Sequence, residues 1–385
     1  MKANDANRAV SRLMCVLLVA ILMNLPGPAD LPAEAGTPGA WATTGALTTA
    51  RAFHTATRLA DGRVLVTGGM DSSGNPLAGC ELYNPADGTW TPAQSLMHTR
   101  SLHSATLLAD GRVLVAGGFN WESGFLPISE IYDPAEGIWK SSGPLNEARI
   151  YNTATLLNDG RILVAGGWNT DSGQLTGAEL YDPDTETWSL SSKTLDKARE
   201  SHTATLLANG TVLVVGGWQD GGSMRGCELY KPTRDSWVSG KRLKVARDSH
   251  TATRLSNGRV LVVGGWSNDH SLKGTELYNP ATGRWRTQGG LKTARDAHTA
   301  TLLPDGRVLV TGGEDSFSIP LKASELYDPA RGKWSYTGSL SESRCGHTAT
   351  LLLDGTVLAA GGYSYSGEDP YALNSAEIYQ PTAGD

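Results

Sequence analysis

The chain has 385 residues, with 33 Lys and Arg against 39 Asp and Glu, which gives a formal net charge of -6. A basic surface that could neutralise a phosphate backbone is not expected, so nucleic acid is excluded as a predicted partner. The 46 glycines and 39% hydrophobic residues are typical of a turn-rich globular protein and not of a disordered one.

The first 35 residues differ from the rest of the chain. Basic residues precede the apolar run Leu13 to Leu25, and the small-residue site Ala33-Glu34-Ala35 follows it. This pattern is typical of a secretory signal peptide, and the run is shorter than the roughly 20 residues that cross a bilayer. We predict a signal peptide over residues 1–35, with cleavage near Ala35 or alternatively near Ala29. The mature protein, residues 36–385, is expected to be secreted or periplasmic, without stable membrane insertion.

Three cysteines lie beyond this segment: Cys80, Cys227 and Cys345. An odd and sparse set argues against a disulfide framework. Cys80 and Cys227 occupy the same position of a repeat, three units apart, so they are not expected to meet.

Seven glycine pairs recur at intervals of 48 to 50 residues, from Gly68-Gly69 to Gly361-Gly362. Each unit begins with Arg-x-x-His-Thr-Ala-Thr or a close variant, reaches its glycine pair, and ends with Glu-Leu/Ile-Tyr and a tryptophan. An Asp-Gly or Asn-Gly pair, such as Asp61-Gly62, separates two runs rich in Thr, Leu and Val and favours a type I′ hairpin. A residue followed by proline, such as Asn84-Pro85, predicts the turn between the last two strands. Each unit therefore predicts four antiparallel strands, here named a to d.

This period and these residues resemble the kelch repeat, through the glycine pair, the later Tyr and Trp and the leading Arg. The resemblance covers residues 41 to 385. It implies an all-β fold, a seven-bladed β-propeller of four-stranded blades that forms a single domain. Kelch propellers serve as binding modules, scaffolds and sometimes enzymes, so the resemblance alone does not select a function.

The strand around Trp41 belongs to no earlier unit, whereas the last unit reaches Glu377-Ile378-Tyr379 without a tryptophan strand after it. One end supplies what the other lacks. We therefore predict that the N-terminal segment is strand d of blade seven, which closes the ring and leaves no exposed sheet edge.

The variable residues of the repeat fall in the b–c loops, which share one face of the disc with the d–a connections. Tryptophan beside amide and acid side chains offers an apolar surface flanked by hydrogen-bonding groups, a combination that suits a sugar ring or a peptide side chain. The alternative is that these rings cover the strand ends. The predicted ligand-binding residues are Phe119, Trp121, Trp168, Asn169, Asp171, Trp218, Asp220, Trp266, Asn268, Asp269 and Tyr363.

Two other sets repeat in register. Six histidines share one position, and blade three carries Asn152 there, which favours a structural hydrogen bond over a metal site. Seven arginines and seven glutamates suggest charge-assisted pairing. The alternative for the arginines is a cationic ring at the channel mouth, with Arg199, Arg247 and Arg295 as the candidates.

We predict an exported binding or interaction module for a carbohydrate or an extracellular protein, monomeric, with no cofactor, no metal and no catalytic residues assigned. The alternative is a secreted carbohydrate-active enzyme. One version is similar to the copper-radical oxidases of the galactose oxidase type, for which Cys345, His347, Tyr363 and Tyr365 lie near one another in blade seven. The other is a sugar epimerase, for which Asp248, Asp296 and His270 are candidates.

Overall fold

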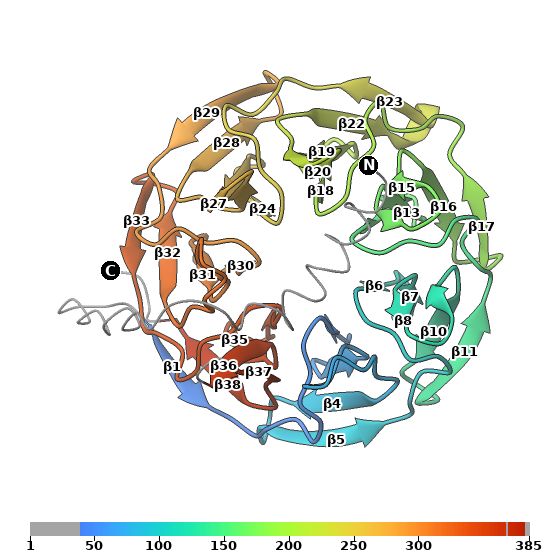
Figure 1. Ribbon diagram of the computed structural model, residues 1–385, viewed down its shortest axis with the longest axis vertical. Helices are drawn as coiled ribbons and strands as arrows, with labels where there is room; N and C mark the ends of the chain where they lie inside the picture. Colours follow the sequence, from blue (N-terminus) through green and yellow to red (C-terminus); the bar gives the residue numbers. More distant parts are fainter. Residues whose placement is uncertain (1–38, 367–368, 382–385) are drawn as a thin grey trace.

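The computed structural model describes residues 39–366 and 369–381, so the predicted signal peptide lies outside the described residues. Seven four-stranded antiparallel sheets stand around a central axis (Figure 1). The predicted all-β, seven-bladed propeller is thereby confirmed. The described part of the chain contains one helical turn, η1 (Pro232–Arg234). No helix within it is both long and apolar enough to cross a membrane.

Each blade runs from an inner strand a to an outer strand d. The inner strands of neighbouring blades lie against one another around the axis. Strands a are β2 (Thr55–Arg58), β6 (Ser104–Leu107), β12 (Thr153–Leu156), β18 (Thr203–Leu206), β24 (Thr251–Arg254), β30 (Thr299–Leu302) and β34 (Thr348–Leu351). Strands b are β3 (Val64–Thr67), β7 (Val113–Ala116), β13 (Ile162–Ala165), β19 (Val212–Val215), β25 (Val260–Val263), β31 (Val308–Thr311) and β35 (Val357–Ala360).

The outer half of each blade holds strands c and d. Strands c are β4 (Cys80–Asn84), β10 (Ser129–Asp133), β16 (Ala178–Asp182), β22 (Cys227–Lys231), β28 (Thr275–Asn279), β32 (Ser324–Asp328) and β38 (Ala376–Gln380). Strands d are β5 (Thr89–Ala93), β11 (Ile138–Ser142), β17 (Thr187–Leu190), β23 (Ser236–Ser239), β29 (Arg284–Gln288), β33 (Lys333–Tyr336) and β1 (Ala40–Thr43).

Blade seven joins the two ends of the propeller. Its sheet has the order β1-β38-β35-β34, and Trp41 of β1 lies opposite Tyr379 of β38. Figure 1 shows β1 beside β38 at the edge of this blade. The ring is therefore closed by the N-terminal strand, as the incomplete first and last units predicted.

Five b–c loops carry an additional two-stranded hairpin. These are β8 (Phe119–Asn120) with β9 (Gly124–Phe125), β14 (Trp168–Asn169) with β15 (Gly173–Gln174), β20 (Trp218–Gln219) with β21 (Gly222–Ser223), β26 (Trp266–Ser267) with β27 (His270–Ser271), and β36 (Tyr363–Ser366) with β37 (Asp369–Ala372). In blades one and six the b–c loop is instead held by a single bridge, Met70↔Pro76 and Glu314↔Pro320 respectively.

The apolar core lies between adjacent blades. Strands b are buried along their whole length, and one cluster joins Leu65 and Cys80 of blade one to Val113 and Tyr132 of blade two. In every blade the tyrosine of strand c contacts the tryptophan of strand d, with ring centroids 5.0 to 5.2 Å apart. The repeated tryptophans thus pack against the interblade core, two of them buried and five half-buried.

Candidate functional site

The b–c face is built by one contact that repeats in all seven blades. The residue after the repeat arginine pairs with the residue after the glycine pair. The pairs are Ala52↔Met70, Ser101↔Phe119, Ile150↔Trp168, Glu200↔Trp218, Asp248↔Trp266, Asp296↔Glu314 and Cys345↔Tyr363. The d–a connection and the b–c loop of each blade are therefore joined on one face, and their variable side chains are brought together.

A second ring lies one residue further along each d–a connection. All seven of its members have positive φ, from 46° to 58°: Phe53, Leu102, Tyr151, Ser201, Ser249, Ala297 and Gly346. Backbone N–H groups donate to the carbonyl of the preceding blade, as from Phe53 to Gly346 (2.9 Å) and from Ser249 to Ser201 (3.0 Å). A left-handed backbone at a non-glycine residue is strained, and it persists here because the neighbouring blades hold it. The ring encircles the axis.

A cavity of about 320 Å³ lies at this ring. Six ring residues line it, together with wall residues from blades five, six and seven. The lining residues are Phe53, Tyr151, Ser201, Ser249, Trp266, Asp296, Ala297, Glu314, Ser318, Cys345, Gly346, Tyr363 and Tyr365. Gly346 leaves room for the Phe53 ring, because a Cβ atom at Gly346 would stand 2.8 Å from Phe53 Cε1. We name this space the axial cavity.

Blade seven supplies a tyrosine and cysteine wall. Cys345 and Tyr363 exchange backbone hydrogen bonds of 3.1 and 2.9 Å, and the Tyr363 and Tyr365 rings lie 5.5 Å apart in an edge arrangement. Burial, followed by the charges of Glu314 and Asp296, raises the pKa of the Cys345 thiol well above its usual value. Burial and then the neighbouring Tyr365 raise the pKa of Tyr363. Both groups are therefore protonated hydrogen-bonding groups at neutral pH, and Cys345 is not a thiolate nucleophile.

Two of the predicted ligand-binding residues, Trp266 and Tyr363, line the axial cavity. Trp168 is only 4% exposed and packs edge-on against Phe125, with ring centroids 5.1 Å apart. Trp168 therefore covers the strand ends, which is the alternative given for these rings. Trp218 is half-buried, whereas Trp121 is 56% exposed and donates from Nε1 to the Gly74 carbonyl (2.8 Å).

The remaining predicted residues lie in the hairpins of blades two to five. Phe119 is half-buried against Trp121, with ring centroids 4.8 Å apart. Asp220 and Asn268 are exposed residues with positive φ at hairpin turns, and Asn268 Oδ1 accepts from the Ser223 N–H of blade four. Asp269 is exposed and contacts His270 (2.6 Å). These polar groups shape the loops, and they are absent from the lining of the axial cavity.

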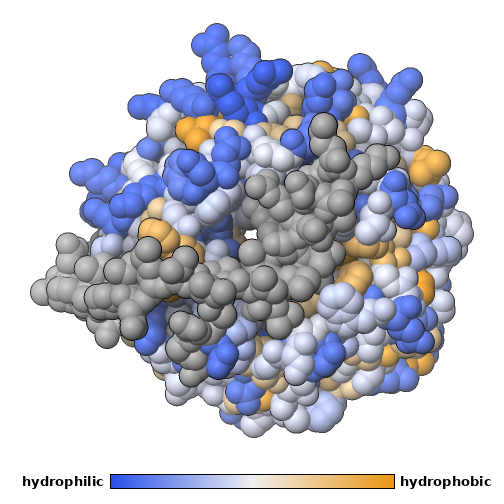
Figure 2. Space-filling model, in the orientation of Figure 1, coloured by the Kyte–Doolittle hydropathy of each residue, from blue (hydrophilic) through white to orange (hydrophobic). Residues whose placement is uncertain are grey.

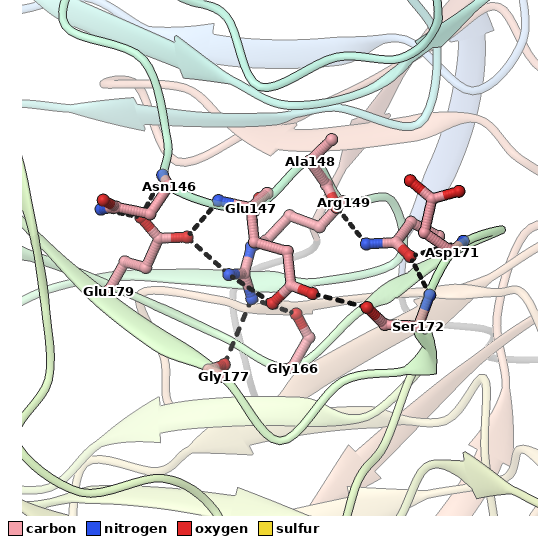
Figure 3. A network of polar contacts seen from close by, with 10 residues as sticks. Asn146, Glu147, Ala148, Arg149, Gly166, Asp171, Ser172, Gly177 and Glu179 are labelled. Atoms are coloured by element: carbon pink, nitrogen blue, oxygen red, sulfur yellow. Dashed lines mark hydrogen bonds and ion pairs between the residues drawn. The ribbon is translucent and has the colours of Figure 1, made fainter.

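Asn169 and Asp171 line a separate, more open groove of about 540 Å³ between blades two and three. Asn169 is buried, and its side chain bonds to the Ala148 carbonyl and to the N–H groups of Asp171 and Ser172. Figure 3 labels the partners of these bonds, Ala148, Asp171 and Ser172, beside Glu147, whose carboxylate accepts from the Ser172 hydroxyl at 3.0 Å. Asn169 thus holds the loop in place, and Asp171 remains exposed at the groove.

The structure corrects the assignment of Arg199, Arg247 and Arg295 to the channel mouth. All three are 0% exposed and each bonds to a strand-c glutamate, as in the 2.6 Å pair between Arg199 and Glu228. Figure 3 shows the same arrangement at Arg149, whose guanidinium lies among Gly166, Gly177 and Glu179. Because the guanidinium groups close the gap between strands b and c of their own blade, they are inaccessible to a ligand from solvent.

The six histidines are also structural. Each Nε2 lies 2.9 to 3.0 Å from a threonine hydroxyl of the preceding blade, as in His347 with Thr299 and His202 with Thr153. Burial, followed by the nearby arginine, lowers the pKa of His202 to about 3. These histidines are neutral at physiological pH and hold adjacent blades together.

Comparison with known proteins agrees with this architecture. A family model described as the KLHDC2/KLHL20/DRC7 Kelch-repeats domain matches residues 128–313, and a Kelch motif model matches residues 51–97. The chain is a kelch-repeat β-propeller. No curated protein sequence matches it.

Among solved structures, this kelch propeller is similar to a fungal alcohol oxidase of the AA5 family, described in complex with copper. The TM-score is 0.71, with 22% identity over 90% of this chain and 77% of that chain. At this identity the likeness shows a shared fold alone.

The side chains around the axial cavity do not provide a copper-binding set. Within residues 39–366 and 369–381, no three His, Cys, Asp or Glu side chains are grouped so that they could hold a metal ion. His347, the histidine near Cys345 in sequence, is engaged with Thr299 between blades. The lining of the axial cavity also contains no histidine, so it offers no imidazole ligand for the copper alternative.

Several cavity residues were not among the predicted ligand-binding set, chiefly Glu314, Ser318 and Tyr365, together with the ring residues Phe53 and Tyr151. Asp296 and Tyr365 were named only as candidate residues of the two enzyme alternatives. The available signal was the variable residue after each repeat arginine, which faces the variable residue after each glycine pair.

Proposed function

We propose that this kelch propeller is an exported binding protein that holds a hydroxyl-rich, sugar-like ligand in the axial cavity. The observation that carries the proposal is the composition of the cavity lining. Aromatic rings of Trp266, Tyr363 and Tyr365 stand beside the carboxylates of Asp296 and Glu314 and the hydroxyl of Ser249. Aromatic faces suit the apolar side of a sugar ring, and carboxylates and hydroxyls suit its hydroxyl groups.

The size of the cavity favours a small ligand or the end of a larger one. About 320 Å³ lies at the lower end of the range for small-molecule sites, roughly 300 to 1,000 Å³. An extracellular protein would instead need a broad contact surface of about 800 Å² on each partner. On the part of the face that is coloured in Figure 2, apolar residues occur in separate patches among hydrophilic ones.

The rim of the cavity offers one further contact. Phe317 is 75% exposed and Ile319 is exposed, and they flank the lining residue Ser318. The loop is preorganised, because Asp315 Oδ1 accepts from the N–H groups of Phe317 (2.9 Å) and Ile319 (3.1 Å). A sugar chain that leaves the cavity on this side would rest on the Phe317 ring.

Binding is tested with a glycan array followed by calorimetry on the ligands found. Trp266→Ala should weaken binding by roughly thirtyfold, since an aromatic anchor typically contributes about 2 kcal/mol. Asp184 and Thr282 lie at exposed turns of the opposite face. The control variants Asp184→Ala and Thr282→Ala should therefore leave the affinity unchanged. Unaltered affinity in a folded Trp266→Ala protein would place the ligand elsewhere.

A second candidate function is catalysis on the same ligand. Asp296 and Glu314 face each other through backbone hydrogen bonds of 3.0 and 3.1 Å, and paired carboxylates can serve as general acid and base. Incubating the bound sugar with the protein and following its anomeric and epimeric forms by NMR tests this candidate. A product that Glu314→Gln no longer forms would establish an enzyme.

A further inference from the structure

The axial cavity is acidic. Of its thirteen described lining residues, Asp296 and Glu314 carry carboxylates, and none is Lys, Arg or His. Both carboxylates lie close enough to Cys345, another lining residue, to raise the pKa of its thiol. A ligand in this cavity therefore meets acidic groups, aromatic rings and hydroxyls, with no basic side chain in the lining.

Further acidic side chains are buried behind the lining of the axial cavity. Glu200 and Asp248 occupy in blades four and five the position that Asp296 occupies in blade six, and both are buried. Asp248 accepts hydrogen bonds from Ser249, a lining residue, at 3.0 Å and from Ser223 at 2.7 Å. The same position in the remaining blades holds Ala52, Ser101, Ile150 and Cys345. The acidic residues are thus gathered on one half of the axis.

The repeat arginines of these blades are matched by another set of glutamates. Arg199, Arg247 and Arg295 direct their guanidinium groups to Glu228, Glu276 and Glu325 and to glycine carbonyls inside the blades. Four further acidic residues are present besides these strand-c glutamates: Glu200, Asp248, Asp296 and Glu314. Among the buried side chains of blades four to six at this end, six are acidic and three are arginines, and the half-buried Glu314 adds a seventh carboxylate.

We propose that the ligand is an amino sugar, whose protonated amine lies at Asp296 and Glu314 while its ring rests on the aromatic wall. This proposal depends on the proposed function, because it names the class of sugar that the same cavity takes. An ammonium group is attracted both to carboxylates and to the face of an aromatic ring such as Trp266, and more strongly when it is shielded from water.

The test compares oligomers that share one ring geometry. Calorimetry measures binding of a β-1,4-glucosamine tetramer, the matching glucose tetramer, in which a hydroxyl replaces each amine, and the N-acetylglucosamine tetramer, in which the amine is neutral. We expect the glucosamine tetramer to bind at least tenfold more tightly than either neutral tetramer. In Glu314→Gln and Asp296→Asn this preference should fall severalfold, because only the glucosamine tetramer carries an ammonium group that loses its carboxylate partner.

The matched control is Asp184→Asn at an exposed turn of the opposite face, which should keep the full preference. Circular dichroism and the melting temperature establish that each variant is folded, and the ratio of two affinities within one variant does not depend on the fraction folded. Equal or tighter binding of a neutral tetramer would overturn the amino-sugar proposal and leave the proposed function standing. Binding of a lysine-rich peptide, with no binding of any sugar, would overturn both.

Discussion

Trp41 and Tyr379, from opposite ends of the described propeller, lie directly across from each other in the pairing of β1 with β38, with ring centroids 5.2 Å apart. In blade one the same contact joins Tyr83 and Trp90, which lie on consecutive strands, with ring centroids 5.0 Å apart. Trp41 Nε1 also donates to Ser324 Oγ of blade six (3.1 Å). Ring closure thus reproduces, over the whole length of the propeller, a contact that every other blade makes locally.

Deleting residues 40–49 should strongly lower the melting temperature. The deletion removes strand β1, the buried Leu47 and the two N–H groups of Thr48 and Thr49 that bond to Glu81. Trp41→Ala alone should cost about 3–5 kcal/mol of unfolding free energy. Thermal and urea unfolding measure both changes. An unchanged melting temperature in the deletion variant would show that closure through β1 is unimportant for stability.

Replacing the loop tryptophans should separate core from surface. Trp168→Ala is expected to cost about 3–5 kcal/mol, because the ring is almost fully buried against Phe125. Trp121→Ala should cost less than about 1 kcal/mol, since the ring is largely exposed. Urea unfolding of the two variants makes the comparison. Equal losses would contradict the assignment of Trp168 as a strand-end cover.

Breaking one repeat ion pair should destabilise its blade. Glu228→Gln leaves the Arg199 guanidinium buried without its carboxylate partner, and the expected cost is about 3–5 kcal/mol. The control is Glu136→Gln, which removes the exposed pair with Lys140 and should cost less than about 1 kcal/mol. Chemical unfolding at neutral pH measures both. A loss at Glu228 no larger than at Glu136 would argue against a structural role for these pairs.

Acid should weaken the propeller through its histidines. His202 binds a proton below about pH 6.5 when unfolded but only near pH 3 when folded, since burial lowers its pKa. The unfolded chain therefore binds more protons between these values. The contribution of each such histidine to the free energy of unfolding is complete above about pH 6.5. It falls by up to about 1.4 kcal/mol per pH unit as the pH drops toward 3.

His202→Asn, which copies the natural Asn152 of blade three, isolates this effect. The variant should be less stable at pH 7, because the bond to Thr153 is lost. Its stability should nevertheless depend less steeply on pH between 6 and 5, by about 1.4 kcal/mol per unit. Urea unfolding at several pH values measures the slope, and parallel curves for parent and variant would disprove the assignment.

The rim residue Phe317 should affect long ligands more than short ones. If a sugar chain occupies the axial cavity as proposed, Phe317→Ala should weaken binding of a tetramer by several-fold and leave a monosaccharide unaffected. The exposed ring contributes little to stability, so the melting temperature should stay within about 2 °C. Calorimetry with both ligand lengths measures the difference, and equal weakening of both would place Phe317 at the cavity itself.

The sequence by itself determined the fold. The spacing of the glycine pairs, the Asp-Gly turns and the tyrosine and tryptophan strands are local signals, and each blade expresses them independently of its neighbours. Closure by the strand around Trp41 followed as well, because the first and last units each lack what the other holds. A structural hydrogen bond for the repeated histidines and charge-assisted pairing of the repeated arginines and glutamates were predicted for the same reason, because a contact made once in each blade conserves its residues once in each repeat. The structure supplied the partners, Thr153 for His202 and Glu228 for Arg199.

Only the tertiary structure decided which variable residues meet. Asp296 and Glu314 lie on different segments of blade six and face each other because the d–a connection pairs with the b–c loop. Phe53 and Tyr151 reach the cavity through a positive φ that the neighbouring blades impose. Trp168 and Trp266 share one repeat position, yet one is buried and the other lines the axial cavity, because the loops around them differ. Such convergence depends on loop conformation and on the placement of blades around an axis, and the repeat pattern encodes neither.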